Sequence, residues 1–307
     1  MTAHKDGKQF ATFGNYSGYL EETRCPVCPA PPAPKLIFRK KDGIGIWRCP
    51  ACGVHYASPR FDEPSLLAIY ENEAFSDMSV YDNWSYDAWA RSGTRGWRLS
   101  NLKTQLVKRY LRDGASVLDV GCGTGEFVAV ARRNNLDAEG IDTSKMLIDV
   151  GRNIMKVPVH QVDSKDFRPS REFDGIVIWD VLEHLYDPVD TLKKCAKLLV
   201  PGGFVFAQVP NLRGLSNRFK SFACRAGLSK KDHGHFGFPY HLYSFDRRSL
   251  AGLMAAAGFN AVHFESWSHL LKDGKSGFPA DLIISAAKKY CLTDYIIVVA
   301  RNDGRRS

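Results

Sequence analysis

The run V-L-D-V-G-C-G-T-G-E-F at 117–127 constrains the fold of this chain more than any other segment. Its apolar residues predict a buried strand, and a helix is expected to begin where the glycines end. Gly121, Gly123 and Gly125 allow positive φ angles and a close approach of the backbone to a ligand. A strand, a glycine turn and a helix in this order are typical of a parallel α/β sheet that binds a ligand at the turn.

Two acidic residues distinguish this turn from the similar turn of dinucleotide-binding enzymes. Asp119 ends the strand just before the glycines, where it would repel a pyrophosphate but attract an amino-acid ammonium group. Asp142 ends the next predicted strand, 21 residues after Gly121, and is placed to accept hydrogen bonds from both hydroxyls of a ribose. The two acids therefore favour a ligand that carries an ammonium group and a ribose.

From residue 116 onward, short apolar runs alternate with helical stretches. This alternation predicts a doubly wound α/β fold with a seven-stranded, mostly parallel sheet. No convincing helix separates the last two strands, which favours an antiparallel final pair. The predicted strands are 116–120, 138–142, 158–162, 175–180, 203–209, 259–265 and 294–300, and the predicted helices lie near 125–134, 144–154, 188–199 and 247–257.

Four of the eight cysteines form two close pairs ahead of this region. Two residues separate Cys25 from Cys28 and Cys49 from Cys52, and twenty residues lie between the pairs. Two such pairs can surround one Zn²⁺ with four thiolates and leave no position for water, so the metal would be structural. The alternative is four unrelated reduced thiols.

Residues 94–301 resemble the class I S-adenosylmethionine-dependent methyltransferases, within the group that includes the ubiquinone-biosynthesis O-methyltransferases and many sugar and natural-product methyltransferases. The motifs that carry the resemblance are D-V-G-C-G-T-G at 119–125, G-I-D-x-S-x-M at 140–146, V-D at 162–163, W-D-V-L-E-H-L-x-D-P at 179–188 and L-L-x-P-G-G at 198–203. Five motifs in the family's order imply a Rossmann-like methyltransferase fold and S-adenosylmethionine as the cofactor.

The resemblance also implies roles for individual residues. Asp119 would hold the methionine amino group of the cofactor, Asp142 its ribose and Asp163 its adenine. Asp180 and the three glycines of the turn would complete the cofactor site. The cysteine ribbon is similar to those on many bacterial methyltransferases of polysaccharide and secondary-metabolite pathways, and to that of a group of rRNA guanine methyltransferases.

These patterns divide the chain into five parts. We expect a loosely ordered leader at 1–24, a zinc ribbon at 25–58, and a helical and aromatic linker at 59–93 over the cofactor site. The methyltransferase domain follows at 94–301, with an acceptor lid at 211–245, and a short tail at 302–307 ends the chain.

The lid is expected to bind the acceptor, because it contains three histidines and two tyrosines at 233–243. A hydroxyl acceptor needs a base to remove its proton, and His241 or His235 is a candidate for that base. His184, which follows the fourth strand, is the other candidate. The loop could instead serve packing and capping. A second metal held by His233, His235 and His241 is disfavoured, since no carboxylate pattern accompanies them.

Positive charge is concentrated in the same region. The chain has a formal net charge of +9, and residues 211–250 carry eight Arg or Lys against two Asp. Such a segment is either a solvated face or a contact for a phosphate-bearing acceptor. Within it, 215–226 has the spacing of a basic amphipathic helix, which could pack on the core, touch that acceptor or rest peripherally on an anionic membrane.

The residues that follow the fourth strand bear on which atom of the acceptor is methylated. No N-P-P-[YF] signature follows the fourth strand, which favours an oxygen over a planar nitrogen as the methylated atom. We therefore expect O-methylation of a sugar or other small or medium acceptor in surface-glycan or secondary-metabolite biosynthesis. The alternatives are RNA base methylation and a non-catalytic subunit that binds the cofactor.

The sequence disfavours nucleic acid as a partner, because the ribbon carries only one short basic run, at 39–41. No apolar run reaches membrane-spanning length, and residues 1–22 lack the apolar core of a secretion signal. We therefore expect a cytoplasmic protein.

Overall fold

The structure of the protein is a computed structural model, and it describes residues 4–5, 8–13, 16–30, 32–39, 43–74, 94–225, 239–267 and 290–304. Some predicted features lie outside these residues. They are the aromatic segment at 81–89 of the linker and His233 and His235 of the lid.

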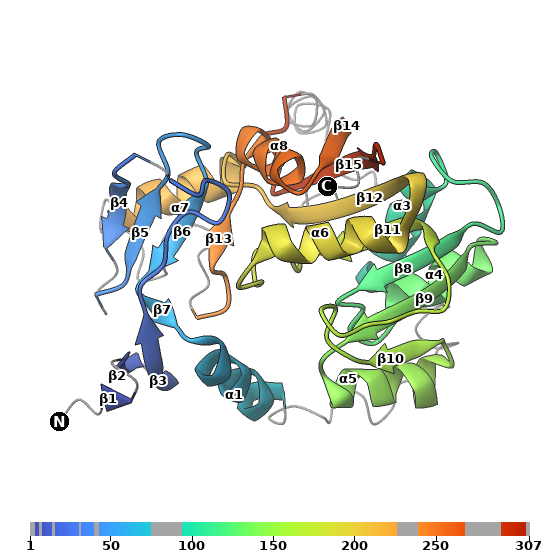
Figure 1. Cartoon of the computed structure of the whole chain (residues 1–307), viewed down its shortest axis with the longest axis horizontal. Coiled ribbons are helices and arrows are strands. Elements are labelled where there is room, and N and C mark those ends of the chain that lie inside the picture. Colours follow the sequence, from blue (N-terminus) through green and yellow to red (C-terminus); the bar gives the residue numbers. More distant parts are fainter. Residues whose placement is uncertain are drawn as a thin grey trace.

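Seven strands form one central sheet. They are β8 (Ser116–Val120), β9 (Asp137–Asp142), β10 (Val159–Gln161), β11 (Phe173–Trp179), β12 (Leu199–Pro210), β14 (Phe259–Trp267) and β15 (Tyr295–Asn302). Their order across the sheet is β10-β9-β8-β11-β12-β15-β14 (Figure 1). The strands from β10 to β12 are parallel, whereas β15 runs antiparallel to both β12 and β14. The predicted doubly wound sheet and its antiparallel final pair are therefore confirmed.

Helices cover both faces of this sheet. They are α3 (Arg95–Val107), α4 (Glu126–Arg133), α5 (Lys145–Val150) with the π-helical turn η2 (Gly151–Met155), α6 (Pro188–Leu198) and α8 (Arg247–Ala256). A further helix, α7 (Leu215–Arg225), lies beside the ribbon strands (Figure 1). Val117 of β8 packs with Val107 of α3 and Val130 of α4 on one face. Its neighbour Leu118 belongs to the other face, together with Leu192 of α6 and residues of α8. Successive strand residues point to opposite faces, so an apolar run such as β8 is buried on both sides.

Local signals explain where the helices begin. Asp187 caps α6 by accepting a hydrogen bond from the Asp190 amide, and Pro188 occupies the first turn, where its missing N–H costs nothing. Asp246 and Ser249 form a capping box at the start of α8. Gly125 adopts the left-handed conformation before α4, with a φ of 77°.

The leader differs from its expected loose order. Strands β2 (Lys8–Phe13) and β3 (Tyr16–Glu21) form an antiparallel hairpin, and β3 pairs with β7 (Arg60–Phe61). With the short β1 (His4–Lys5) they make a four-stranded sheet. Gly14 and Asn15 separate the two strands of the hairpin in sequence, and Gly-Asn between two apolar-aromatic runs is a hairpin signal that predicts this element.

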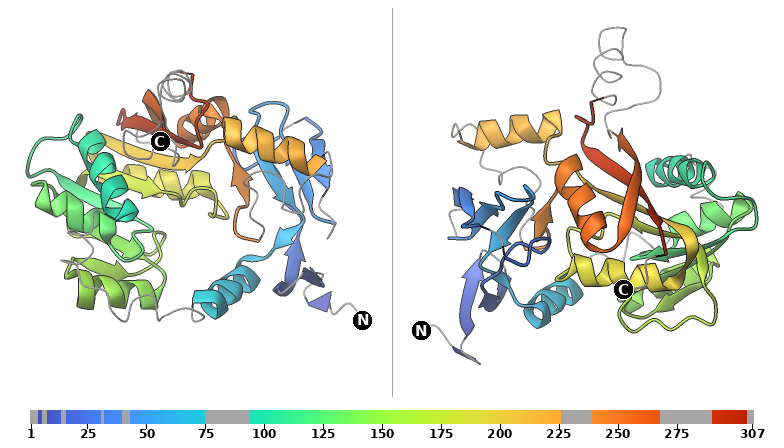
Figure 2. Two further views of the ribbon diagram at one scale, coloured as in Figure 1. Left: turned by 180° about the vertical axis from the view of Figure 1, so that it is seen from behind. Right: turned by 45° about the horizontal axis from the view of Figure 1, so that its top comes forward.

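The ribbon is not a separate unit. Its strands β4 (Lys35–Arg39), β5 (Gly45–Arg48) and β6 (His55–Ser58) form an antiparallel sheet, and the fourth strand of that sheet is β13 (Tyr243–Ser244) from the end of the predicted lid. Tyr243 pairs with Tyr56 and Ser244 with His55. Two regions that are almost two hundred residues apart in the sequence therefore share a sheet, and Figure 2 shows β13 beside the blue ribbon strands in both views.

The first helix, α1 (Glu63–Ala74), lies within the segment expected to be a helical linker. Figure 1 shows α1 below the sheet, between β3 and α5. Ser65 of α1 accepts a hydrogen bond from the Tyr19 amide of β3 at 2.9 Å. Among the described residues, no helix has the length and apolar character needed to cross a membrane.

Candidate active site

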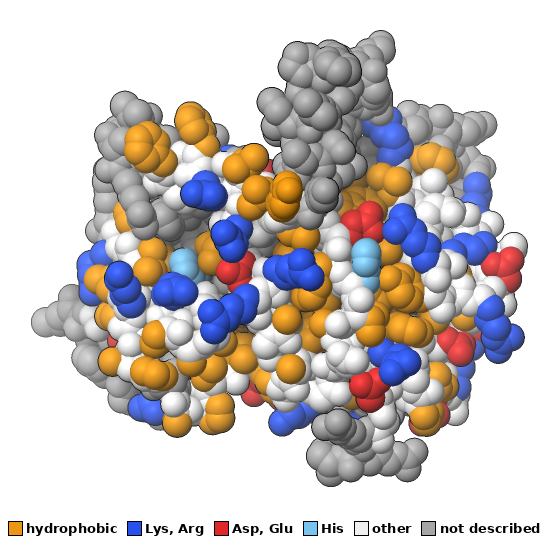
Figure 3. Space-filling view, turned by 90° about the horizontal axis from the view of Figure 1, so that it is seen from above, with side chains coloured by type: hydrophobic (Ala, Val, Ile, Leu, Met, Phe, Trp, Pro, Cys, Tyr) orange, Lys and Arg blue, Asp and Glu red, His pale blue; other side chains and the backbone are white. Residues whose placement is uncertain are grey.

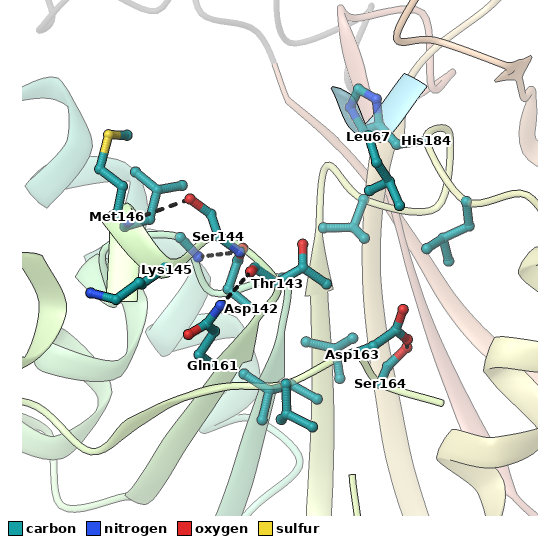
Figure 4. A pocket seen from close by; sticks show the side chains of 18 of the residues that line it. Leu67, Asp142, Thr143, Ser144, Lys145, Met146, Gln161, Asp163, Ser164 and His184 are labelled. Carbon is teal, nitrogen blue, oxygen red and sulfur yellow. Dashed lines mark hydrogen bonds between the residues drawn. The ribbon is translucent and has the colours of Figure 1, made fainter. Parts of the chain in front are cut away.

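A cavity of about 1210 Å³ opens at the carboxyl ends of β8, β9, β10 and β11. Ligands of open α/β sheets bind at this edge, where the loops after the strands meet. Figure 4 shows Asp142 and Ser144 on one side of the cavity and Leu67 and His184 on the other. We call these two sides the cofactor half, lined by residues 120–164, and the acceptor half, lined by α1 and by residues 179–186.

The glycine turn shapes the cofactor half. Gly121, Gly123 and Gly125 all have positive φ angles, of 75°, 55° and 77°. A Cβ atom at Gly121 would lie 2.4 Å from the Val181 side chain, and one at Gly125 would lie 2.7 Å from Val157. A Cβ at Gly123 would meet no atom within 4 Å, so this glycine leaves open space on the cavity wall. The turn therefore needs glycine for its backbone at three positions and leaves room for a ligand at one.

Asp142 is held in place by two backbone amides. Its Oδ2 accepts a hydrogen bond from Gly123 N at 2.9 Å, and its Oδ1 accepts one from Ser144 N at 2.9 Å. Ser144 in turn caps α5. Each carboxylate oxygen has further lone pairs, so the oriented group can accept the two hydroxyls of a ribose. This geometry agrees with the role that the resemblance implies for Asp142.

Asp163 lies on the loop after β10 and lines the same half. Its Oδ1 accepts a hydrogen bond from Lys165 N, and its Oδ2 lies 3.3 Å from Lys165 Nζ. The same ammonium lies 3.5 Å from Glu63 Oε1 of α1. The two carboxylates, Asp163 foremost, raise the pKa of Lys165. Lys165, which the motifs did not predict, thus connects the two halves of the cavity.

Asp119 lies behind the wall of the cavity. Its side chain is buried, and no described residue hydrogen-bonds its Oδ1. Burial raises the pKa of this carboxyl to about 8, with a further contribution from Asp142 and an opposing one from Lys103. A buried carboxyl with an unpaired oxygen is suited to an ammonium partner, which would also favour its ionised form.

Asp180 follows β11 with a positive φ of 60°. Gln208 Nε2 donates to both of its carboxylate oxygens, at 2.9 and 2.7 Å. Lys103 Nζ lies 3.7 Å from Asp180 Oδ2 and 4.9 Å from the centre of the Trp179 ring. Gln208 and Lys103 were not predicted, because no motif marks them and they come from β12 and α3. They hold the candidate cofactor residue Asp180 from behind.

The candidate bases His184 and His241 lie in contact with each other. Their ring centres are 4.8 Å apart with the rings nearly perpendicular, and His184 lines the cavity. Its Nδ1 lies 2.9 Å from the Tyr240 carbonyl oxygen, which can only accept, so Nδ1 carries the proton and Nε2 does not. Burial, together with His241, lowers the pKa of His184 to about 4. This imidazole is therefore neutral at pH 7 and can accept a proton at Nε2.

A carboxylate accompanies the two histidines. Glu183 Oε1 lies 4.0 Å from His184 Nε2, and burial raises the pKa of this almost fully buried acid well above its usual range. Ligand atoms of Glu183, His184 and His241 lie within 4.8 Å of one another, a donor set that could also hold a divalent cation. It differs from the set that the sequence disfavours for a second metal, His233, His235 and His241, of which the first two lie outside the described residues.

The four ribbon cysteines converge on one point, as their spacing predicts. Their sulfurs lie within 4.8 Å of one another, with Cys25 Sγ 3.4 Å from Cys52 Sγ. Four sulfurs at a Zn–S distance of about 2.3 Å from one ion would be roughly 3.8 Å apart, so the donor set fits tetrahedral zinc. Burial and the neighbouring Cys52 raise the pKa of Cys28 to about 11. Such crowded thiols ionise together only beside a cation.

Comparison with known proteins agrees with this site. Residues 94–264 match the family described as a methyltransferase domain. The ubiquinone biosynthesis O-methyltransferase of Hydrogenovibrio crunogenus is 25% identical over 209 residues, which cover 63% of this chain and 87% of that protein. The protein of the same name from Alkalilimnicola ehrlichii is 33% identical over 106 residues, which cover 32% of this chain and 43% of that protein.

A solved structure shows the same fold at lower identity. The 1,6-didemethyltoxoflavin-N1-methyltransferase of Burkholderia thailandensis superimposes with a TM-score of 0.51 and 15% identity, covering 88% of this chain and 99% of that one. The family match covers more than half of the chain, and it includes the glycine turn and Asp142. The chain therefore belongs to this family and is an S-adenosylmethionine-dependent methyltransferase.

Proposed function

We propose that the protein methylates a hydroxyl group of a small or medium acceptor, with His184 as the base. The observation that carries this proposal is the neutral imidazole in the cavity wall, with its proton fixed on Nδ1 by the Tyr240 carbonyl. A hydroxyl acceptor must lose its proton as its oxygen bonds to the methyl carbon. The relatives described above are named as O-methyltransferases, which supports oxygen as the methylated atom.

The described residues have different roles in cofactor binding and proton transfer. When bound, S-adenosylmethionine supplies an electrophilic methyl group on a sulfonium. Asp142 and Asp163 bind and orient the ribose and adenine, and the buried carboxyl of Asp119 attracts the ammonium group from behind the cavity wall. His184 Nε2 takes the proton of the acceptor hydroxyl. His241 does not line the cavity but packs against His184, so it supports the base and is not itself the first group to receive the proton.

The walls of the acceptor half favour an acceptor with one apolar face. Leu66 and Leu67 of α1 and Leu185 and Tyr186 after β11 line it. The cavity exceeds the roughly 300–1,000 Å³ of common small-molecule sites, which leaves space for an acceptor beside the cofactor. A sugar packs the C–H side of its ring on such a wall, and an aromatic alcohol packs its ring. A sugar in glycan or secondary-metabolite biosynthesis remains our first candidate.

A methyl-transfer assay tests the acceptor. Labelled cofactor is supplied to the protein with a fractionated lysate, and the label is followed into glycan, small molecule and RNA. Label in glycan or small molecule supports the proposal, whereas label in RNA supports base methylation instead. An absence of label in every fraction, with normal cofactor binding, would support a non-catalytic subunit.

The ribbon is proposed to hold one structural Zn²⁺ through Cys25, Cys28, Cys49 and Cys52. Metal analysis of protein purified without added zinc should give one equivalent per chain. The double variant Cys49→Ser/Cys52→Ser should lose it, while Cys195→Ser, which changes a buried thiol outside the ribbon, should keep it. Full zinc retention in the double variant would contradict the assignment.

Peripheral contact with an anionic membrane is a second candidate function, for the basic helix at 215–226. Phe219 and Phe222 of α7 are 72% and 65% exposed, beside the exposed Arg218 and Lys220. Figure 3 shows Lys and Arg side chains spread over one face of the molecule, with acidic side chains beside some of them, mainly on the right of the view. Aromatic and basic side chains on one short helix suit a membrane interface.

Vesicle sedimentation tests this contact. Vesicles that contain anionic lipid should pellet the protein, vesicles of neutral lipid should not, and Phe219→Ser/Phe222→Ser should abolish the difference. Equal binding by the variant would exclude α7 as the contact.

A further inference from the structure

The segment around β13 forms the rear support of the acceptor half. It carries the Tyr240 carbonyl, which holds His184 Nδ1, and His241, which packs on the His184 ring. The orientation of the proposed base therefore depends on a stretch of backbone that is almost sixty residues away in the sequence. The contacts that hold residues 240–241 in place therefore determine the orientation of the His184 ring.

Two sets of contacts hold it. On one side, the amides of Leu242 and Tyr243 both donate to the Glu183 carbonyl, at 2.8 and 3.2 Å. On the other side, β13 pairs with β6 of the cysteine ribbon, and the Ala57 amide donates to the Leu242 carbonyl at 3.1 Å. The segment is thus clamped between the loop that bears His184 and the strand that follows Cys52.

A buried arginine links the same parts through side chains. Arg60 Nη1 donates to the Tyr243 hydroxyl at 2.9 Å, and that hydroxyl donates to the Tyr186 carbonyl at 3.1 Å. The guanidinium lies 4.1 Å from the centre of the Tyr186 ring and forms an ion pair with Glu21 at 2.9 Å. The Tyr186 hydroxyl donates to the Phe61 carbonyl at 2.7 Å, which connects the network back to the residue that follows Arg60.

Arg60 is well suited to this position. It is 8% exposed, and its charge is paired by Glu21 and stacked on an aromatic ring, so it is not a solvated surface group. The planar guanidinium can donate to several partners at once in fixed directions, which an ammonium cannot do. Tyr186 also lines the cavity, so the network extends to the wall of the acceptor half.

We infer that Arg60 and Tyr243 are positioning residues, which together with the pairing of β13 to the ribbon strand β6 fix the Tyr240 carbonyl and His241 behind the base. The ribbon, in this view, is the rear wall of the acceptor half and not an independent module. The inference rests on the proposed role of His184. It assigns no contact with the acceptor to Arg60 or Tyr243.

The first test is Tyr243→Phe, which removes one hydroxyl and leaves the strand pairing of β13 intact. We expect kcat to fall about 10-fold, below the roughly 10²-fold that a 1 Å misplacement can cost. The affinity for S-adenosylhomocysteine and the zinc content should not change. Arg60→Lys, which can keep a charge beside Glu21 but loses the directed second donor, should act in the same direction. Tyr110→Phe, on the far side of the sheet, is the matched control.

A double-mutant cycle separates positioning from general damage. If Tyr243 acts through the support of His184, Tyr243→Phe should have no further effect on kcat in a His184→Ala background. An equal factor in both backgrounds would overturn the inference.

Hydrogen exchange gives a readout that does not require activity. In Tyr243→Phe the amides of Leu242 and Tyr243 should exchange roughly 10-fold faster, and those of the glycine turn should be unchanged. Cys49→Ser/Cys52→Ser should have the same selective effect. Unchanged exchange at 242–243 in both variants would refute the coupling. If His184→Ala leaves turnover intact, the proposed base is wrong, and the exchange data alone then decide whether the ribbon holds this segment.

Discussion

The cofactor half of the cavity is built from residues that lie close together in the sequence, whereas the acceptor half is collected from four distant places. Residues 120–164 supply the glycine turn, Asp142 and Asp163. The opposite wall takes Leu66 from α1, His184 from the loop after β11, and its rear support from the ribbon and β13. A site of the first kind keeps its geometry through local turns and caps, while one of the second kind depends on long-range packing.

The difference suggests how each half can change. In the cofactor half, the backbone amides of Gly123 and Ser144 orient the Asp142 carboxylate, and this arrangement is independent of the acceptor. The acceptor half is lined by side chains of α1 and the loop at 179–186 that can vary without disturbing the glycine turn. Substitutions should therefore fall into two classes, one that changes cofactor affinity and one that changes turnover.

The largest effect is expected from the base. His184→Ala should lower kcat by roughly 10²–10⁴-fold, because the acceptor hydroxyl then has no group to take its proton. Cofactor affinity should remain as in the wild type, since His184 lies in the other half. Steady-state kinetics and calorimetry with S-adenosylhomocysteine measure the two quantities. His160→Ala, on the edge strand, serves as control.

The pH profile identifies the same base. Burial and His241 lower the pKa of His184 to about 4, so its neutral, proton-accepting form persists well below pH 6.5. The rate should therefore stay level as pH falls through 6 and decline only as pH approaches 4. A midpoint near 6.5 that survives in His184→Ala would point to another group.

Asp142 should give the next largest effect. Asp142→Ala removes the carboxylate that we propose accepts two charge-assisted hydrogen bonds from the ribose, and it should weaken cofactor binding by roughly 2–4 kcal/mol. Asp142→Asn should cost less, because it keeps one acceptor oxygen. Calorimetry on the folded variants measures both losses. Unchanged affinity in Asp142→Ala would remove this residue from the site, and with it the proposed division of the cavity.

The same contrast explains what could be predicted from the sequence. The strands, the glycine turn and the place of Asp142 at the end of a strand can be predicted from local sequence patterns, and the described sheet contains these strands. Arg60, Lys103 and Gln208 have no such signal, because each acts on a partner more than twenty residues away. β13 is only two residues long and is a strand because it pairs with β6, so no local sequence periodicity predicts it.

Proton release on cofactor binding is a smaller effect that tests Asp119. Burial raises the pKa of Asp119 to about 8, so the carboxyl is protonated in the free protein at pH 6–7. An ammonium group favours the carboxylate, so binding should release a proton, and affinity should rise with pH by up to about tenfold per unit in this range. Calorimetry in two buffers with different heats of ionisation counts the proton. In Asp119→Asn the heat should no longer depend on the buffer; a buffer-independent heat in the wild type would separate Asp119 from the ammonium.

The smallest effect concerns Lys165, which joins the halves across the cavity mouth by contacting both Asp163 and Glu63. The lysine side chain is 49% exposed, and ion pairs of this kind contribute about 0–1 kcal/mol and weaken with salt. Lys165→Ala should therefore reduce affinity for S-adenosylhomocysteine by no more than about 1 kcal/mol at low ionic strength, and the loss should vanish at high salt. Lys194→Ala, which breaks an ion pair with Asp190 on α6 away from the cavity, provides the control at both salt concentrations. A much larger loss, or one that persists in high salt, would mean that α1 closes over the cofactor as part of its binding site, and the two halves would then have to be treated as one.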